Sequence, residues 1–144
     1  VALLRTGVVL NKNGGALARM LPAFRLGLGA LIGSGEQWMS WIELEDLIQV
    51  ILWSIHSGYS GPINAVAPYP TKNKDFVKAL GQALKRPTIL PMPEFLVNIL
   101  FGSMGQETVL ANIGIEPHVL KGSGFQWACP TVESALNKAL NHVR

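Results

Sequence analysis

The sequence predicts an α/β protein in which short strands alternate with amphipathic helices. It opens on an apolar run at residues 1–10, six of which are Val or Leu. Such a run, without polar alternation, is typical of a strand buried on both faces of a parallel sheet. A stripe of Leu and Ile follows at residues 44–55, and a second short apolar run stands at residues 62–67. Strands in this order, with helices between them, predict part of a parallel sheet.

A first helix is expected at residues 16–25. Apolar residues recur there at helical spacing from Leu17 to Phe24, which is the pattern of an amphipathic helix. Pro22 lacks a backbone donor and is expected to kink or shorten this helix. The preceding residues 11–15 contain two Asn and two Gly, so they predict a turn.

Extended segments are expected at residues 28–35 and 36–42, and the Leu- and Ile-rich helix follows them. Glu43, Glu45 and Asp46 stand at the start of that helix, where the helix dipole favours negative charge. Three carboxylates also allow a metal site or acid–base chemistry. Acidic side chains at a helix start more often accept hydrogen bonds from unpaired backbone N–H groups. We therefore predict that they are capping groups.

The second half of the chain is predicted to alternate helices with short strands. Thr71 and Thr131 are expected to cap two of these helices. A domain boundary near residue 70 is predicted, which gives domains 1–70 and 71–144. The predicted elements are a helix to residue 85, an edge strand at 88–90, helices at 93–101 and 106–112, a helical turn at 117–121, a strand at 125–129 and a last helix at 132–143.

The composition limits the kind of protein this is. Charged residues make up 15% of the chain, against about 25% in a typical soluble domain, and the mean hydropathy is +0.29. Such a chain is expected to cover apolar surface with a partner or with a further part of itself; a well-packed small domain is the alternative. No apolar window approaches the roughly 20 residues of a membrane-spanning helix. The basic residues around 72–86 have no interleaved aromatic residues, so nucleic-acid binding is not expected.

Few residues stand out as chemical groups. The single cysteine, Cys129, excludes an internal disulfide and indicates a reducing, cytoplasmic location; we interpret it as a buried apolar residue. The three histidines are too far apart in the sequence to suggest a metal site. The glycines at 27–35 lack the strand and helix that a phosphate-binding loop requires, so a pocket-lining loop is expected. Trp38 and Trp41 occupy one extended segment, so one of them can face a pocket, but core filling is the more expected use of each.

Four segments carry a resemblance to a known family. They are Arg5-Thr-Gly-Val-Val-Leu10, Gly33-Ser-Gly-Glu-Gln37 with Ser40-Trp-Ile42, Pro62-Ile-Asn-Ala-Val-Ala-Pro68, and residues 95–136. Together they resemble the second half of the extended short-chain dehydrogenase/reductases, in the epimerase-like branch with an added C-terminal domain. The resemblance implies the last strands of a Rossmann-like sheet plus a small mixed α/β substrate-side domain. Glu43 departs from the family, which commonly has His after Trp-Ile.

The resemblance also implies a role for the whole protein. Relatives of this kind bind NADP or NAD and a small-molecule substrate. Carried over by position, Arg5 and Leu10 are candidate cofactor-binding residues, whereas Arg25, Gln37 and Trp41 are candidate substrate-binding residues. No catalytic or metal-binding residue is assigned.

The family's glycine-rich nucleotide loop and its Tyr-x-x-x-Lys pair are absent from the sequence. Ile63 and Asn73 stand where Lys would follow Tyr59 and Tyr69. The chain is therefore expected to be a C-terminal portion that is not competent alone. A missing N-terminal half is its expected partner, and a non-catalytic binding or self-association module is the alternative.

Overall fold

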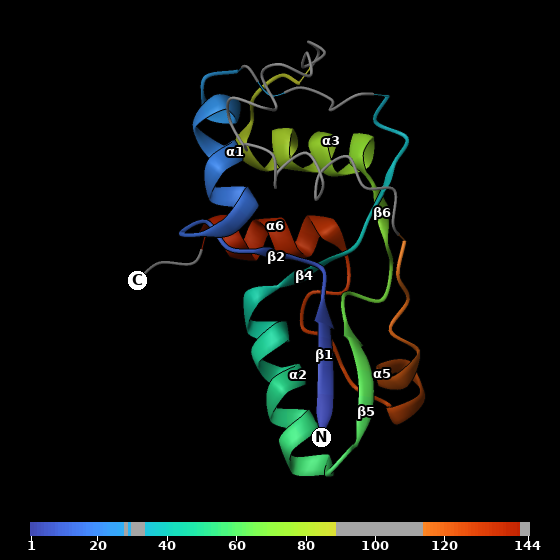
Figure 1. Cartoon of the computed structure of the whole chain (residues 1–144). Helices are drawn as coiled ribbons and strands as arrows, with labels where there is room; N and C mark the ends of the chain where they lie inside the picture. The colour runs from blue at the N-terminus through green and yellow to red at the C-terminus, as the bar shows by residue number, and fades with distance from the viewer. Residues whose placement is uncertain (28, 30–33, 89–113, 142–144) are drawn as a thin grey trace.

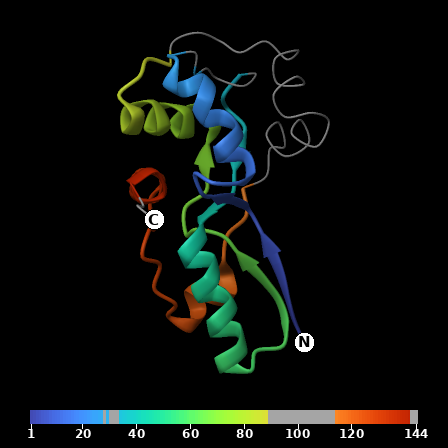
Figure 2. The same cartoon turned by 90° about the vertical axis from the view of Figure 1, so that its left-hand side faces the viewer.

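The computed structural model describes residues 1–27, 29, 34–88 and 114–141. Two parallel strands, β1 (Ala2–Thr6) and β5 (Gly61–Ala65), lie side by side at one end of the molecule (Figure 1). Helix α2 (Leu44–Ser57) covers one face of this pair, and the short helix α5 (His118–Ser123) lies beside β5. Figure 2 shows β1 as the outer strand of the pair.

The other end of the molecule consists mainly of helices. Helices α1 (Gly15–Arg25), α3 (Asn73–Leu84) and α6 (Val132–Asn141) pack on one another there (Figure 1). Two further short ladders complete the fold, and all three ladders are two-stranded among the described residues. The parallel pair β2–β4 and the antiparallel pair β3–β6 join β1–β5; their bounds are β2 (Val8–Leu10), β3 (Trp38–Met39), β4 (Trp41–Glu43) and β6 (Thr71–Lys72).

The apolar run at residues 1–10 forms two strands, so the prediction of one strand was wrong. The break falls at Gly7, where a Cβ atom would lie 2.5 Å from the carbonyl oxygen of Ser40. Val8 donates its backbone N–H to that same oxygen at 2.8 Å, which directs the second strand toward β4. The expected burial on both faces is also not found, because Leu3 in β1 is 59% exposed.

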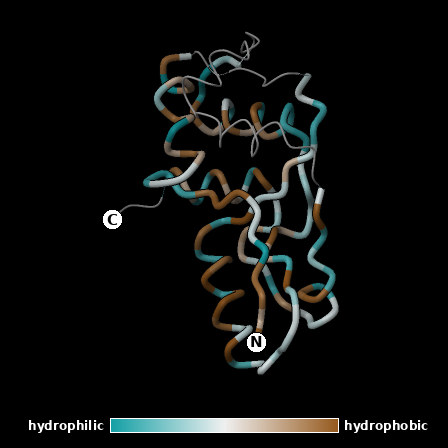
Figure 3. Tube along the Cα trace, viewed as in Figure 1, coloured by the Kyte–Doolittle hydropathy of each residue, from teal (hydrophilic) through white to brown (hydrophobic). Residues whose placement is uncertain are grey.

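Helices α1 and α2 form where their patterns predicted them. Helix α1 continues through Pro22 and ends at Arg25, with Leu17 and Phe24 buried. Helix α2 ends at Gly58, which adopts the left-handed conformation at φ 66°. The apolar face of α2 is nevertheless largely exposed, and Figure 3 shows how hydrophobic this helix is. Its exposed members are Ile48, Ile51, Leu52 and Ile55.

The two predicted threonine caps have different outcomes. Thr131 caps α6, because its Oγ1 accepts the backbone N–H of Ser134 at 3.2 Å. Thr71 does not cap α3: the residue before that helix is Lys72, which makes no capping bond. The hydroxyl of Thr71 instead accepts the indole N–H of Trp41 at 3.1 Å.

The strand predicted at residues 125–129 does not form. The backbone N–H groups of Ala128 and Cys129 both donate to the carboxylate of Asp46, each at 2.9 Å. These donors are therefore unavailable for a strand ladder. The neighbouring Phe125 and Trp127 rings meet edge to face with their centroids 5.1 Å apart.

The hydrophobic core consists of two clusters. The larger joins α1, α3 and α6, with Leu17, Phe76 and Leu136 among its members. The smaller lies between β5 and α2 and includes Ile63 and Leu120. Both clusters contain residues from before and after position 70, and the domain boundary predicted there stays a prediction.

Several predicted elements lie partly or wholly outside the described residues. They are the loop at 28–35, the strand at 88–90 and the helices at 93–101 and 106–112. Thr88, the one described residue of that strand, is not in strand conformation. The helical turn predicted at 117–121 corresponds to α5. Within the described ranges, no helix is long and apolar enough to cross a membrane.

Candidate functional site

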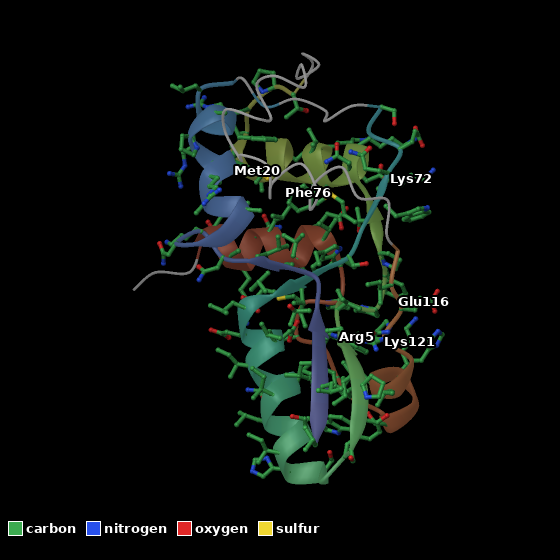
Figure 4. The ribbon with its side chains drawn as sticks, viewed as in Figure 1. Arg5, Met20, Lys72, Phe76, Glu116 and Lys121 are labelled. Atoms are coloured by element: carbon green, nitrogen blue, oxygen red, sulfur yellow. The ribbon has the colours of Figure 1, made fainter. Side chains whose placement is uncertain are left out.

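Polar side chains gather where the parallel strands β1 and β5 end. Arg5 and Thr6 are exposed at the carboxyl end of β1, and Arg5 pairs in register with Asn64 of β5. Asn64 donates its side-chain amide to the backbone oxygen of Glu116 at 3.2 Å. In Figure 4 Arg5 lies at the same height as Glu116 and Lys121. Ligands of open α/β sheets bind at the carboxyl ends of the strands, so this edge is the candidate functional site.

Two of the residues predicted from the sequence lie in the core. Leu10 is 0% exposed and Trp41 is 1% exposed, and both belong to the larger hydrophobic cluster. The indole N–H of Trp41 donates to Thr71. Neither side chain reaches the surface of the described part of the chain. Both pack against other residues of the larger hydrophobic cluster.

Gln37 and Arg25 lie in two further places. The backbone oxygen of Gln37 accepts the N–H of Asn73 at 2.9 Å and thereby ties the segment before β3 to the start of α3. Arg25 is the last residue of α1, which leads away from β1 (Figure 1). Its backbone oxygen accepts the guanidinium N–H of Arg86 at 2.9 Å. The structure does not bring Arg25 together with Arg5, and the predicted roles of these residues remain predictions.

The carboxylates at the start of α2 form a buried cluster with Cys129. Ligand atoms of Glu43, Asp46 and Cys129 lie within 4.8 Å of one another. Glu43 caps the helix, as predicted, by accepting the N–H groups of Glu45 and Asp46 at 2.9 and 3.3 Å. Asp46 is not a cap, because its two oxygens accept the N–H groups of residues 128 and 129. Backbone donors thus satisfy both carboxylates, and we interpret the cluster as structural.

The electrostatics around Cys129 agree with this interpretation. Burial, and then the negative charge of Asp46, raise the pKa of the Cys129 thiol. A thiol with a raised pKa is a poor nucleophile and a poor metal ligand at neutral pH. Nearby, Lys138 lies 2.6 Å from Glu45 and 3.7 Å from Glu43. The hydrogen bond to Glu45 raises the pKa of Lys138 and ties α6 to α2.

Sequence reasoning missed Thr6, Asn64 and Glu116 at the carboxyl edge. Asn64 is a polar residue within an apolar strand, and this was the one signal that the sequence offered. The partner of Asn64 lies 52 positions later. No local pattern indicates that contact.

The fold places the chain in a class of proteins. It is a Rossmann-like α/β structure of the kind found in epimerases and short-chain dehydrogenase/reductases, as the resemblance predicted. The structure superposes on human epimerase family protein SDR39U1 (isoform 2), crystallised with NADPH, with a TM-score of 0.88 and 35% identity over 97% of this chain and 48% of that one. The nucleoside-diphosphate sugar epimerase of Corynebacterium glutamicum gives a TM-score of 0.72 and 30% identity over 99% of this chain and 26% of that one.

Sequence comparison finds relatives among the epimerase family proteins. The chain is 43% identical over 140 residues to epimerase family protein ML0860 of Mycobacterium leprae, which covers 96% of this chain and 46% of that protein. Residues 92–139 match a domain of unknown function, DUF1731. The chain is thus similar to a C-terminal portion of epimerase family proteins of the SDR39U1 kind. It spans about half the length of the relatives it matches.

Proposed function

We propose that this chain is the C-terminal, substrate-side portion of an NAD(P)-dependent epimerase or oxidoreductase. In this proposal it completes a Rossmann-like sheet together with a separate nucleotide-binding half. The proposal rests on the free edge of strand β1. Among the described residues, β1 is paired on one side only, by β5. A parallel sheet in α/β proteins is covered on both faces and continues through buried strands.

The exposed apolar face of α2 supports the same proposal. Ile48, Ile51, Leu52 and Ile55 are 38–68% exposed, although they recur at the spacing of a buried helix stripe. Covering what remains exposed of each would stabilise an assembly by about 1 kcal/mol per side chain. A further strand beside β1 and a further helix beside α2 would cover both surfaces.

The carboxyl edge of β1 suits the nicotinamide end of a dinucleotide. Arg5 and Thr6 offer hydrogen-bonding groups there, whereas the phosphates require a glycine-rich loop that this sequence lacks. We propose that Arg5 and Leu10 lie on the cofactor side, with Leu10 acting through its backbone and its packing. Arg25, Gln37 and Trp41 are proposed for the substrate side, where Arg25 would meet an anionic group.

The chain alone is proposed to be inactive. NADP or NAD supplies or accepts the hydride when it is bound, and the positioned acid–base group is proposed to belong to the nucleotide-binding half. Neither Tyr59 nor Tyr69 is followed by Lys at the fourth position. The small-molecule substrate is therefore expected to bind only to the complete protein. The single, buried Cys129 favours a reducing location such as the cytoplasm.

The test compares the chain alone with a fusion. The part of the human relative that this chain does not cover is joined ahead of residue 1, and NADPH fluorescence is titrated against both proteins. We expect saturable binding by the fusion and none by the chain alone. Binding by the chain alone, or a folded fusion that does not bind NADPH, would contradict the proposal.

A matched pair of variants tests the contact between the halves. Ile51→Asp places a charge in the apolar face of α2 and is expected to weaken NADPH binding by the fusion at least tenfold. Gln49→Asp adds the same charge at an exposed polar position of the same helix, and its binding should match the parent fusion. Equal behaviour of the two variants would remove α2 from the contact.

Self-association is the second candidate function, and the same exposed surfaces favour it. An unpaired strand edge is a template for pairing with another chain. Light scattering of the isolated chain distinguishes the two candidates. A defined oligomer would favour a self-association module, whereas a monomer at high concentration would count against it.

A further inference from the structure

Helix α2 is apolar on two opposite sides. Its inner side holds Val50, which is 0% exposed and belongs to the smaller core cluster with Ile63. Consecutive residues of an α-helix are about 100° apart around its axis, so Ile48, Leu52 and Ile55 each lie roughly 140–160° from Val50. These three side chains are 44%, 40% and 68% exposed. Together they form what we call the outer stripe.

The outer stripe faces away from the rest of the described chain. Figure 2 looks onto the side of α2 that is opposite β1 and β5, and no described element crosses in front of it. The segment that leads to α6 runs along one flank of the helix, where Ala128 and Cys129 donate to Asp46. Strand β1 lies on the other flank (Figure 2).

The nucleotide-binding half of the proposed function meets α2 from the flank of β1. A strand added beside β1 continues the sheet, and its helix packs next to α2 in the same layer. Ile51 lies about 100° from Val50, on the flank opposite Asp46, and is within reach of such a helix. The outer stripe lies further round and points out of that layer. Since a helix that is apolar all round is normally buried, the stripe requires a second cover.

The spacing of the outer stripe suits a second copy of the same helix. Residues 48, 52 and 55 follow the pattern i, i+4, i+7, which is the spacing of the core positions in a coiled-coil seam. An antiparallel pair of identical helices places Ile48 of each copy opposite Ile55 of the other, with the two Leu52 side chains adjacent. The stripe is therefore complementary to itself about a two-fold axis, as a symmetric dimer requires.

The charges of α2 also favour an antiparallel pair. The helix contains no Lys or Arg, its exposed acidic residue Glu45 is in the first turn, and the exposed His56 is in the last turn. Antiparallel packing brings Glu45 within about one turn of His56 in the second copy and pairs opposite ends of the helix dipoles. A parallel pair would bring the two Glu45 carboxylates together. The lack of basic residues disfavours an anionic lipid surface as the cover.

We propose that the complete protein is a homodimer in which the two α2 helices pack antiparallel along the outer stripe. The proposal rests on the proposed function in one respect, that the other half of the protein covers only the flank of β1. A helix of 14 residues is about 21 Å long and about 10 Å wide. It is too small to bury the roughly 800 Å² per partner of a standard interface, so the dimer is expected to be reversible.

The test is sedimentation velocity of the fusion described above, over about a hundredfold range of concentration. We expect the average mass to rise from one copy toward two. Leu52→Glu should weaken the dimer about tenfold or more, because the pair would bury an unpaired charge. Gln82→Glu adds the same charge at an exposed position of α3 and should behave as the parent.

NADPH titration of the same samples separates this inference from the proposed function. Leu52→Glu and Gln82→Glu should both bind NADPH as the parent fusion does, because neither alters the flank of β1. A fusion that binds no NADPH contradicts the proposed function, whereas its mass and the effect of Leu52→Glu still decide the dimer.

Two more measurements examine the orientation of the helices. Leu52→Cys should form a disulfide between copies under mild oxidation, whereas Gln82→Cys should not. His56→Glu should weaken the dimer about fivefold or more by facing Glu45 with a like charge, and His56→Lys should not weaken it; equal effects of the two would exclude antiparallel packing. A fusion that remains a single copy at every concentration, or a dimer that Leu52→Glu leaves unchanged, would overturn the proposal. Binding of the fusion to phosphatidylglycerol vesicles that Leu52→Glu abolishes would also overturn it, since the stripe would then be a membrane contact.

Discussion

The carboxylate of Asp46 gives the sharpest test of how the two ends of the chain are joined. It is 1% exposed and accepts the N–H groups of Ala128 and Cys129, each at 2.9 Å. A hydrogen bond to a charged group contributes about 1.5–3 kcal/mol. Asp46→Asn keeps the shape but turns one acceptor into a donor, so one of the two bonds is lost.

We therefore expect Asp46→Asn to lower the free energy of unfolding by about 2 kcal/mol and the melting temperature by roughly 5–10 °C. Circular dichroism during urea and thermal unfolding measures both values. Glu45→Gln is the control, because the Glu45 carboxylate belongs to the same turn but is half-exposed beside Lys138. This substitution should lower the free energy of unfolding by less than about 1 kcal/mol. The reasoning is refuted if Asp46→Asn unfolds within 0.5 kcal/mol of the parent, a threshold of about the size of an ordinary surface substitution.

Three further predictions concern other contacts. Gly7→Ala should lower the free energy of unfolding by roughly 2 kcal/mol or more, because its Cβ would meet the oxygen of Ser40 at 2.5 Å; a urea midpoint equal to the parent's would contradict this. Cys129 should react slowly with iodoacetamide at pH 8 and rapidly in urea, since burial raises its pKa; mass spectrometry measures the rate, and equal rates would show an accessible thiolate. The pKa of Lys138 is raised in the folded state, so its bond to Glu45 stabilises the fold below the ordinary lysine pKa of 10.5 and the benefit is lost as the pH rises through the folded value. The stability difference between the parent and Lys138→Met should thus shrink above pH 10.5, and a constant difference would exclude an ionic contribution.

Local patterns predicted the helices well and the strands less well. Helices α1, α3 and α6 each carry a periodic apolar face that is buried, so the local spacing of apolar residues was enough to predict them. The break at Gly7 depends on Ser40, a residue 33 positions away whose carbonyl approaches the backbone. The segment 125–129 looks like a strand by composition. Its backbone donors bind Asp46, 82 and 83 positions earlier, and no local pattern could indicate that.

The candidate site was predicted unevenly for the same reason. Arg5 lies near the carboxyl end of β1; it was named through the family resemblance and not from a local pattern, and its cofactor-binding role stays a prediction. Core filling was the more expected use of both tryptophans in the segment 36–42; Trp41 is 1% exposed and lies in the core, whereas Trp38 is 41% exposed.

The bond between Asp46 and the segment at residues 128–129 also affects the kinetics of folding. A contact that spans 82 residues closes late, because long loops must lose chain entropy before such a contact forms. During synthesis, α2 leaves the ribosome long before the donors of its acidic side chain have been translated. Until then the carboxylate must remain hydrated, and the apolar residues around it cannot complete their packing. Consolidation of the packing around Asp46 is therefore expected to wait for residues 128 and 129, in keeping with the slow folding of chains rich in distant contacts.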